Sequence, residues 1–314
     1  MKSVIVLCLD AFRYDLINEH LTPNLYRETQ ESVNYTNCQS GNSTTLLSMP
    51  ILLCGEKKYL PGLSLPAKVK RYGLKSYMLS ANSLIDREFN QKWTDYFSFT
   101  KGKVGVDKDF NKRKNLRRAI PPLSLPNSIK RLMKRMYRQF SDPDSYLVYD
   151  RCETILKASK IILEDPKPKF VWIHLMETHQ PYYPPKALEK EDPKELIYLN
   201  DLQIDAARGW IKLDEKTNKK LWELYKDEAC YLDKNLGDFF KVIDWNQNTV
   251  IVTSDHGEEF GECGQWGHRA DKFIPELVHV PLIIINGKKK TVEDPINHYK
   301  FPEIAIKEII EKEI

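Results

Sequence analysis

The sequence contains no apolar run of the roughly 18–20 residues that a membrane-spanning helix needs. Its first residues, MKSVIVLCLD, resemble a signal peptide only faintly, because the apolar run is short, lacks a small-residue cleavage site and leads directly into Asp10. We interpret this run as the first strand of the fold. We therefore expect a cytoplasmic protein, with peripheral attachment at the inner membrane surface as an alternative.

Cysteine is also scarce: the six residues are scattered and none is in CxxC spacing, which argues against a zinc knuckle and a disulfide framework. There is no internal repeat. The net charge of +4 is small for 314 residues, a length sufficient for one large α/β domain with a substantial core. Bulk composition thus indicates an ordinary soluble protein, and by itself it excludes few other classes of function.

Five β-rich apolar segments predict strands, at 3–9, 75–82, 169–175, 249–254 and 279–286. Segments with helical spacing separate them, namely a helix with Pro23 in its first turn and helices near 65–72 and 221–242. Strands that alternate with helices favour a doubly wound α/β fold. We predict a mixed, mostly parallel sheet flanked by helices, in a single catalytic domain spanning residues 1–314.

A basic insertion at about 101–145 interrupts this pattern. From Lys101 to Arg138 there are thirteen Lys or Arg residues and two Asp residues, so the rest of the chain is net acidic. Residues 128–140 within it predict a basic amphipathic helix. This helix could pack its apolar face on the domain, hold a polyanionic substrate, or contact an anionic membrane peripherally.

Metal-binding residue types follow three of the predicted strands. Asp10 comes after the first strand, and Asp255 and His256 come after the fourth, whereas His179 follows the third. In doubly wound sheets, ligands bind at the carboxyl ends of the strands. We therefore expect these side chains to converge, with two carboxylates and an imidazole available to a divalent cation.

Several motifs, in their order along the chain, resemble those of the alkaline phosphatase superfamily. They are LCLDAFRYD, STTLLSMPILLCG, HLMETHQPYYPP, VTSDHGEEFGE followed by WGH, and HVPLIII. The most similar branch is the sulfatase-like group that includes phosphoglycerol transferases such as lipoteichoic acid synthase. The resemblance implies an alkaline phosphatase/sulfatase-like fold and a metal held by Asp10, Thr45, Asp255 and His256.

In this family the nucleophile begins a helix, and counting back from Gly55 places it at Thr45, with Thr44 or Ser43 as alternatives. A hydroxyl there would lie in the positive potential of the helix N-terminus. The chain departs from true sulfatases because it lacks their CxPxR pattern, so formylglycine chemistry is not expected. An Asp-His pair where sulfatases have Asp-Asn favours manganese or zinc, with magnesium or calcium as alternatives.

The resemblance also assigns His179 and His268 to the transferred group, as hydrogen-bond donors or as the general acid. A second metal would require an acid at the position of Leu175, so we expect a single metal ion. His174 reads equally well as a buried structural histidine or as a ligand, and Arg13 reads as structural. Glu258 and Glu259 are expected to orient ligands.

These features together predict a metal-dependent hydrolase or phosphotransferase that uses a threonine nucleophile. Its substrate would be an anionic phosphate or sulfate ester, on a glycan or a lipid headgroup. The alternatives are a sulfatase that works without formylglycine, and an inactive relative that binds an anionic glycan or a membrane through the insertion. A nucleic-acid-binding protein is disfavoured because the basic stretch carries few aromatic residues and no binding motif.

Overall fold

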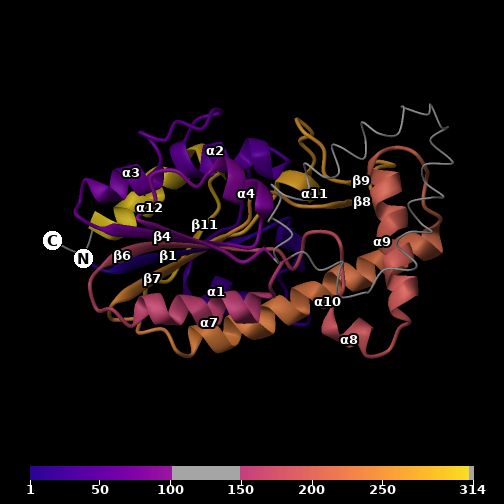
Figure 1. The fold of residues 1–314 in the computed structure, drawn as a ribbon, viewed down its shortest axis with the longest axis horizontal. Helices are drawn as coiled ribbons and strands as arrows, with labels where there is room; N and C mark the ends of the chain where they lie inside the picture. Colours follow the sequence, from indigo (N-terminus) through magenta and orange to yellow (C-terminus); the bar gives the residue numbers. More distant parts are fainter. Residues whose placement is uncertain (101–148, 311–314) are drawn as a thin grey trace, which may run out of the picture.

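A computed structural model of the chain describes residues 1–100 and 149–310. The predicted basic insertion at 101–145 and its helix at 128–140 lie outside the described residues. The centre of the fold is an eight-stranded sheet in the order β11-β2-β10-β7-β1-β6-β4-β5 (Figure 1). Its strands are β1 (Ser3–Leu9), β2 (Val33–Tyr35), β4 (Lys75–Ser80), β5 (Asp95–Ser98), β6 (Lys169–Leu175), β7 (Asn248–Thr253), β10 (Leu282–Ile285) and β11 (Lys290–Val292).

Strand β10 runs antiparallel to β7 and β2, whereas the other pairings in this sheet are parallel. The mixed, mostly parallel α/β class predicted from the sequence is therefore confirmed. Strand β1 lies between β7 and β6, with Val6 opposite Ile251 on one side and Trp172 on the other. Because these three strands are parallel and in register, their carboxyl ends meet at one edge of the sheet.

Helices cover both faces of the sheet (Figure 1). On one face lie α1 (Pro23–Glu31), α7 (Cys152–Leu163) and α10 (Glu215–Phe240), and on the other α2 (Thr45–Cys54), α3 (Leu65–Lys70) and α12 (Phe301–Ile310). Strand β1 alternates between the two cores: Ile5 and Leu7 join the α7–α10 side, and Val4 and Val6 join the α2–α12 side. Burial on both faces explains why the strand reads as a continuous apolar run.

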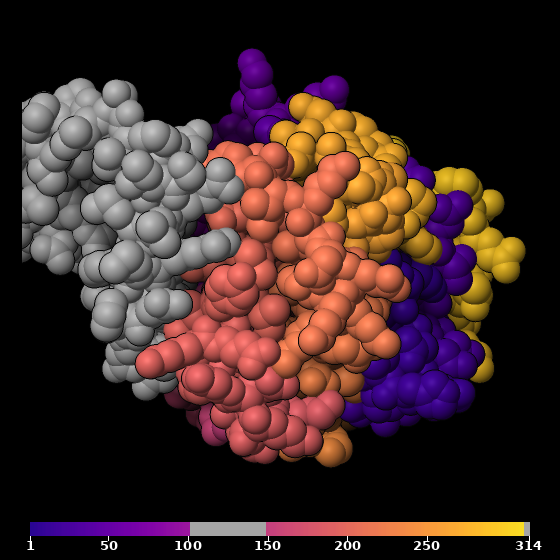
Figure 2. Space-filling model, turned by 90° about the vertical axis from the view of Figure 1, so that its right-hand side faces the viewer, coloured from indigo at the N-terminus to yellow at the C-terminus, as the bar shows by residue number. Residues whose placement is uncertain are grey.

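Further elements follow the strands at their carboxyl ends. They are η1 (Tyr14–Leu16), α4 (Ser83–Glu88), α8 (Pro185–Leu188), α9 (Pro193–Ala207), the β8–β9 hairpin (Glu259–Phe260 and Trp266–Gly267) and α11 (Pro275–Val278). Strands β3 (Cys38–Gln39) and β12 (Ile296–Asn297) pair separately, and η3 (His298–Lys300) follows them. Figure 2 shows α9 and the start of α10 beside the 260–275 region on this side of the molecule. Among the described residues, no helix has the length and apolar character needed to span a membrane.

Three predicted helix boundaries were wrong, one of them the end of helix α10, which lies at Phe240 rather than at residue 242. Helix α10 begins six residues before the predicted start at Leu221, because the Asp214 carboxylate caps it by accepting a hydrogen bond of 2.7 Å from the amide of Thr217. Helix α3 ends at Lys70 rather than at residue 72.

Candidate metal centre and nucleophile

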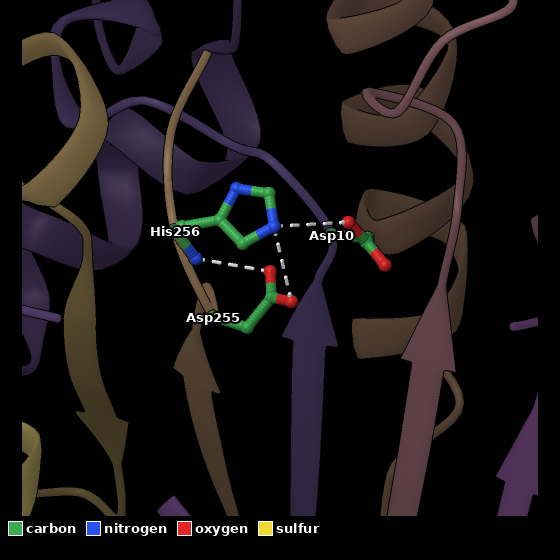
Figure 3. Close-up of side chains that lie close together, drawn as sticks. All are labelled: Asp10, Asp255 and His256. Atoms are coloured by element: carbon green, nitrogen blue, oxygen red, sulfur yellow. Dashed lines mark hydrogen bonds and ion pairs between the residues drawn. The ribbon is translucent and has the colours of Figure 1, made fainter. Parts of the chain in front are cut away.

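Three metal-ligating side chains meet where β1 and β7 end (Figure 3). Asp10 follows β1 directly, and Asp255 and His256 lie just beyond β7. All three side chains are fully buried, and one ligand atom from each lies within 4.8 Å of the others. The convergence expected from the strand ends is thus present in the structure.

Each carboxylate turns one unpartnered oxygen toward His256. The Oδ1 atom of Asp255 accepts hydrogen bonds from the amides of Ala11 (3.2 Å) and His256 (3.0 Å). Its other oxygen, Oδ2, has no hydrogen-bond partner among the described residues and lies 3.5 Å from Nε2 of His256. Oδ1 of Asp10 is likewise unpartnered within the described chain, 3.8 Å from the same nitrogen. Two buried acceptor atoms therefore face one imidazole.

The imidazole of His256 is oriented to offer a lone pair to the same space. Its Nδ1 donates to the carbonyl of Gly257 at 2.8 Å, because a carbonyl oxygen can only accept. Burial lowers the pKa of His256 to about 3, so the ring is neutral and Nε2 carries a free lone pair. A Cβ atom at Gly257 would lie 2.0 Å from the carbonyl oxygen of Glu276, so only glycine fits beside this histidine.

The electrostatics of this cluster favour a cation. Burial and the charge of Asp10 raise the pKa of Asp255 to about 7. Burial opposes ionisation of Asp10 as well, but His179 and His174 outweigh it and hold the pKa of Asp10 far below its ordinary value. Two buried carboxylates that face each other repel when both are ionised, and a divalent cation between them removes that cost. The donor set of carboxylate oxygens and one imidazole nitrogen fits such an ion.

Thr45 is the first residue of helix α2, and Thr44 is its N-cap. The Thr45 side-chain oxygen, Oγ1, lies 3.2 Å from Nε2 of His256, so it joins the cluster. The Ser43 hydroxyl is engaged elsewhere, since it donates to the carbonyl of Arg269 and accepts from the amide of Lys272. Of the two hydroxyls whose contacts are defined, Thr45 and not Ser43 faces the candidate ligands.

The predicted substrate-facing histidines lie beside this cluster. The ring centroid of His268 is 4.4 Å from that of His256 and 5.2 Å from that of His179. His268 holds Glu258 through Nδ1, at 3.2 Å from Oε2. Burial lowers the pKa of His268, but the charge and hydrogen bond of Glu258 outweigh this effect and raise the pKa to about 9. The Nδ1 of His179 donates to the carbonyl of Gln180 at 2.6 Å.

Two further predicted residues have structural surroundings. His174 is fully buried and contacts Oδ2 of Asp10, the carboxylate oxygen that faces away from Nε2 of His256. It is not part of the three-residue ligand group. Arg13 pairs with Asp15 and Glu262, and its guanidinium lies 4.8 Å from the centroid of the Trp222 ring. Arg13 thus ties the start of the chain to the 258–262 segment.

Asn82 also contacts Asp10 and was not predicted from the sequence. Its side-chain nitrogen donates to Oδ2 of Asp10 at 2.7 Å. The only available signal was its position at the end of a predicted strand, next to the strand that leads to His174.

Comparison with known proteins identifies the family and the fold. The sulfatase family model matches residues 2–302, whereas a search of curated proteins returned no match. Phosphonate monoester hydrolase of Agrobacterium radiobacter is a similar structure, with a TM-score of 0.62 and 15% identity over 96% of this chain and 72% of that one.

Two further solved structures have the same fold. Lipoteichoic acid synthase LtaP from Listeria monocytogenes has a TM-score of 0.63 and 14% identity, covering 96% of this chain and 70% of that one. The C-terminal periplasmic domain of EcEptC from Escherichia coli, in complex with zinc, has a TM-score of 0.62 and 15% identity, with coverage of 96% and 80%. The chain belongs to the sulfatase family, within the alkaline phosphatase superfamily.

Proposed function

We propose that this protein is a metal-dependent enzyme that cleaves an anionic phosphate ester through Thr45 and passes the phosphorus-containing group to water or to an acceptor hydroxyl. The observation that carries the proposal is the convergence of four buried atoms. Oδ1 of Asp10, Oδ2 of Asp255 and Nε2 of His256 lie together, with Oγ1 of Thr45 in contact with that nitrogen.

These four atoms are the ones that would hold the metal. When bound, a divalent cation supplies a Lewis acid that lowers the pKa of a hydroxyl and neutralises charge on the ester. The set contains one nitrogen and three oxygens, and each carboxylate has a single unpartnered oxygen. Zinc is commonly four-coordinate with such donors, whereas calcium takes 6–8 oxygens. We therefore favour zinc or manganese, as single ions.

The roles of the protein side chains follow from their positions. The Thr45 oxygen attacks phosphorus, its proton leaves to solvent, and the bond from phosphorus to the leaving oxygen breaks. His268, held by Glu258 through Nδ1, protonates the leaving oxygen from Nε2. The same nitrogen later accepts the proton of the incoming water or alcohol as its oxygen bonds to phosphorus, the bond from phosphorus to Thr45 breaks, and Thr45 regains a proton from solvent. His179, next to His268, donates to the oxygens of the transferred group.

Threonine at position 45 supports phosphate over sulfate as the transferred group. Formylglycine arises from cysteine or serine, and neither stands at this position. A glycan or a lipid headgroup is the proposed carrier of the ester. A similar structure named as a lipoteichoic acid synthase supports this class of carrier, and one named as a phosphonate monoester hydrolase supports a phosphorus-containing transferred group.

The test is turnover of three chromogenic esters by metal-stripped protein, with zinc, manganese, magnesium or calcium added back. The esters are p-nitrophenyl phosphate, bis-p-nitrophenyl phosphate and p-nitrophenyl sulfate. We expect zinc or manganese to restore cleavage of a phosphate ester. Restored cleavage of the sulfate alone would favour a sulfatase that works without formylglycine.

Absence of turnover combined with tight metal binding would require the test to be repeated with an alcohol acceptor, such as glycerol. Absence of both turnover and metal binding would contradict the proposal and favour an inactive, anion-binding relative.

A further inference from the structure

The oxygen of Asp10 that faces away from His256 accepts two hydrogen bonds. Nε2 of His174 lies 2.9 Å from Oδ2 of Asp10, and Nδ2 of Asn82 lies 2.7 Å from the same atom. His174 and Asp10 are fully buried, and Asn82 is 4% exposed. We propose that His174 and Asn82 are positioning residues that restrict Asp10 to one ligand oxygen and thereby select a small, four-coordinate cation over calcium.

Asn82 can only donate to Asp10, because its other side-chain atom is already committed. Its Oδ1 accepts a hydrogen bond of 2.9 Å from the amide of Leu84 and so caps helix α4. The amide group of asparagine has one acceptor end and one donor end, so the cap fixes Nδ2 toward Asp10. The Asn82 backbone is held as well, since its amide donates to Oγ of Ser80 at 3.0 Å.

His174 approaches the same oxygen from the strand beside β1. Its Cα is paired with Cys8 of β1 and with Ser80 of β4, so it lies in register between the ligand strand and the strand that leads to Asn82. A carboxylate oxygen can only accept, so Nε2 of His174 carries the proton. Its Nδ1 has no hydrogen-bond partner among the residues that the structure describes. Within the described part of the chain, the contact with Asp10 is therefore the one hydrogen bond that this ring makes.

Two donors on Oδ2 fill the lone-pair positions of that oxygen and leave Oδ1 free. Calcium is often held by carboxylates that use both oxygens, within a shell of 6–8 oxygen atoms. With Oδ2 occupied, Asp10 offers one atom, which suits the four-coordinate geometry of zinc. Groups that orient a metal ligand in this way typically change metal affinity by about 10–100-fold when they are removed.

The proposal rests on the metal site of the proposed function, and the experiment separates the two. Dissociation constants for zinc, manganese and calcium would be measured by titration of metal-stripped wild type and variants. Asn82→Ser keeps a capping oxygen but removes the side-chain amide N–H group that reaches Asp10. His174→Phe removes the other donor at similar volume. We expect each to weaken zinc binding about 10–100-fold and to weaken calcium binding less. His174→Gln, which retains a donor, should recover part of the zinc affinity.

Control substitutions are available outside the ligand group, at an exposed capping asparagine and at a buried histidine. Asn297→Ser changes a capping asparagine of η3, and His298→Phe removes a buried histidine that contacts Thr253. Both should keep the zinc affinity of the wild type. If His174→Phe does not fold, the comparison between Asn82→Ser and Asn297→Ser decides. Folded Asn82 and His174 variants with wild-type affinities would overturn this inference alone, whereas a wild type that binds no metal would overturn both proposals.

Discussion

The side-chain oxygen of Thr45 lies 3.2 Å from Nε2 of His256, although 211 positions separate the two residues in the sequence. The contact joins the start of helix α2 to the loop after β7, and so brings a hydroxyl to the positive end of a helix and to the free lone pair of a neutral imidazole. Because this nitrogen also faces the two unpartnered carboxylate oxygens, the hydroxyl and the metal ligands share one small, buried space.

The register of the nucleophile can be tested with adjacent threonines. Thr45→Ala should lower turnover by at least about 1,000-fold, because the attacking oxygen is lost. Thr44→Ala should stay within about tenfold of the wild type, since Thr44 is the N-cap residue and makes no side-chain cap hydrogen bond. Steady-state kinetics on the ester that proves active would measure both. A dead Thr44 variant beside an active Thr45 variant would shift the nucleophile by one residue.

Asp255→Asn should weaken metal binding and stabilise the metal-free protein. It removes one of two buried carboxylates that face each other, so the metal-free variant should have a larger free energy of unfolding than the metal-free wild type at pH 8. Zinc at 100 times its dissociation constant should stabilise the wild type by about 2.7 kcal/mol and the variant much less. Urea unfolding with and without zinc measures both effects. Equal stabilisation of the two proteins by zinc would remove Asp255 from the ligand set.

The sequence was sufficient for those parts of the fold that carry a strong local pattern. The five predicted strands are all present, because burial on both faces makes most of them continuous apolar runs. Strands β2, β5 and β11 were not predicted, since they are short and partly exposed. Helix α9 was not predicted either. It buries polar side chains, among them Asn200 and Gln203, and these interrupt the apolar spacing by which a helix is recognised.

Some residues of the candidate site could be predicted from the sequence and others could not. Residues that follow a strand, such as Asp10 and Asp255, could be expected to converge because the ends of parallel strands meet. Asn82 could not be singled out, because an asparagine after a strand reads as a helix cap, which it also is. The catalytic roles of Thr45, His179 and His268 stay predictions.

Buried charges around the loop that follows His179 also had no sequence signal. Glu228 of α10 accepts a hydrogen bond of 2.8 Å from the amide of Tyr183 and pairs with Arg151 at 2.7 Å, and Arg151 also donates to the Tyr183 carbonyl. Both backbone groups of Tyr183 are thus held by one ion pair. These contacts join residues that are distant in the sequence, so no local pattern predicts them.

This ion pair predicts a pH-dependent stability difference in Glu228→Gln. Burial raises the pKa of Glu228 to about 7, against the lowering effect of Arg151. Between about pH 4.5 and pH 7, Glu228 therefore keeps its proton in the folded protein but has released it in the unfolded chain. The free energy of unfolding of the wild type falls as the pH rises through this range. The variant lacks this loss, so its stability relative to the wild type should rise across that range by up to about 3 kcal/mol.

Urea unfolding of both proteins at pH 5, 6, 7 and 8 would measure this difference, in which the titrations common to both proteins cancel. Glu223→Gln is the matched control, because it changes a 54% exposed carboxylate on the same helix. Its difference from the wild type should stay flat. A flat difference for Glu228→Gln as well would mean that Glu228 is ionised in the folded protein throughout.

The ends of the undescribed segment 101–148 lie side by side, which makes its role testable. Thr100 and Tyr149 form an antiparallel bridge, and the amide of Asp150 donates to the carbonyl of Phe99 at 2.7 Å. A linker of about four to six Gly and Ser residues can therefore join them in place of the segment. We expect this variant to fold, to bind zinc with wild-type affinity, and to cleave a small chromogenic ester within about tenfold of the wild-type rate.

Binding to vesicles that contain anionic lipid should be lost in the same variant, because the segment carries thirteen Lys or Arg residues between Lys101 and Arg138. Vesicle sedimentation measures this property separately from turnover, with neutral vesicles as the control. Loss of turnover with zinc affinity intact would instead assign the segment to the substrate pocket. Unchanged vesicle binding would contradict a membrane role for the helix predicted at 128–140 and leave packing on the domain or contact with a polyanionic substrate as its function.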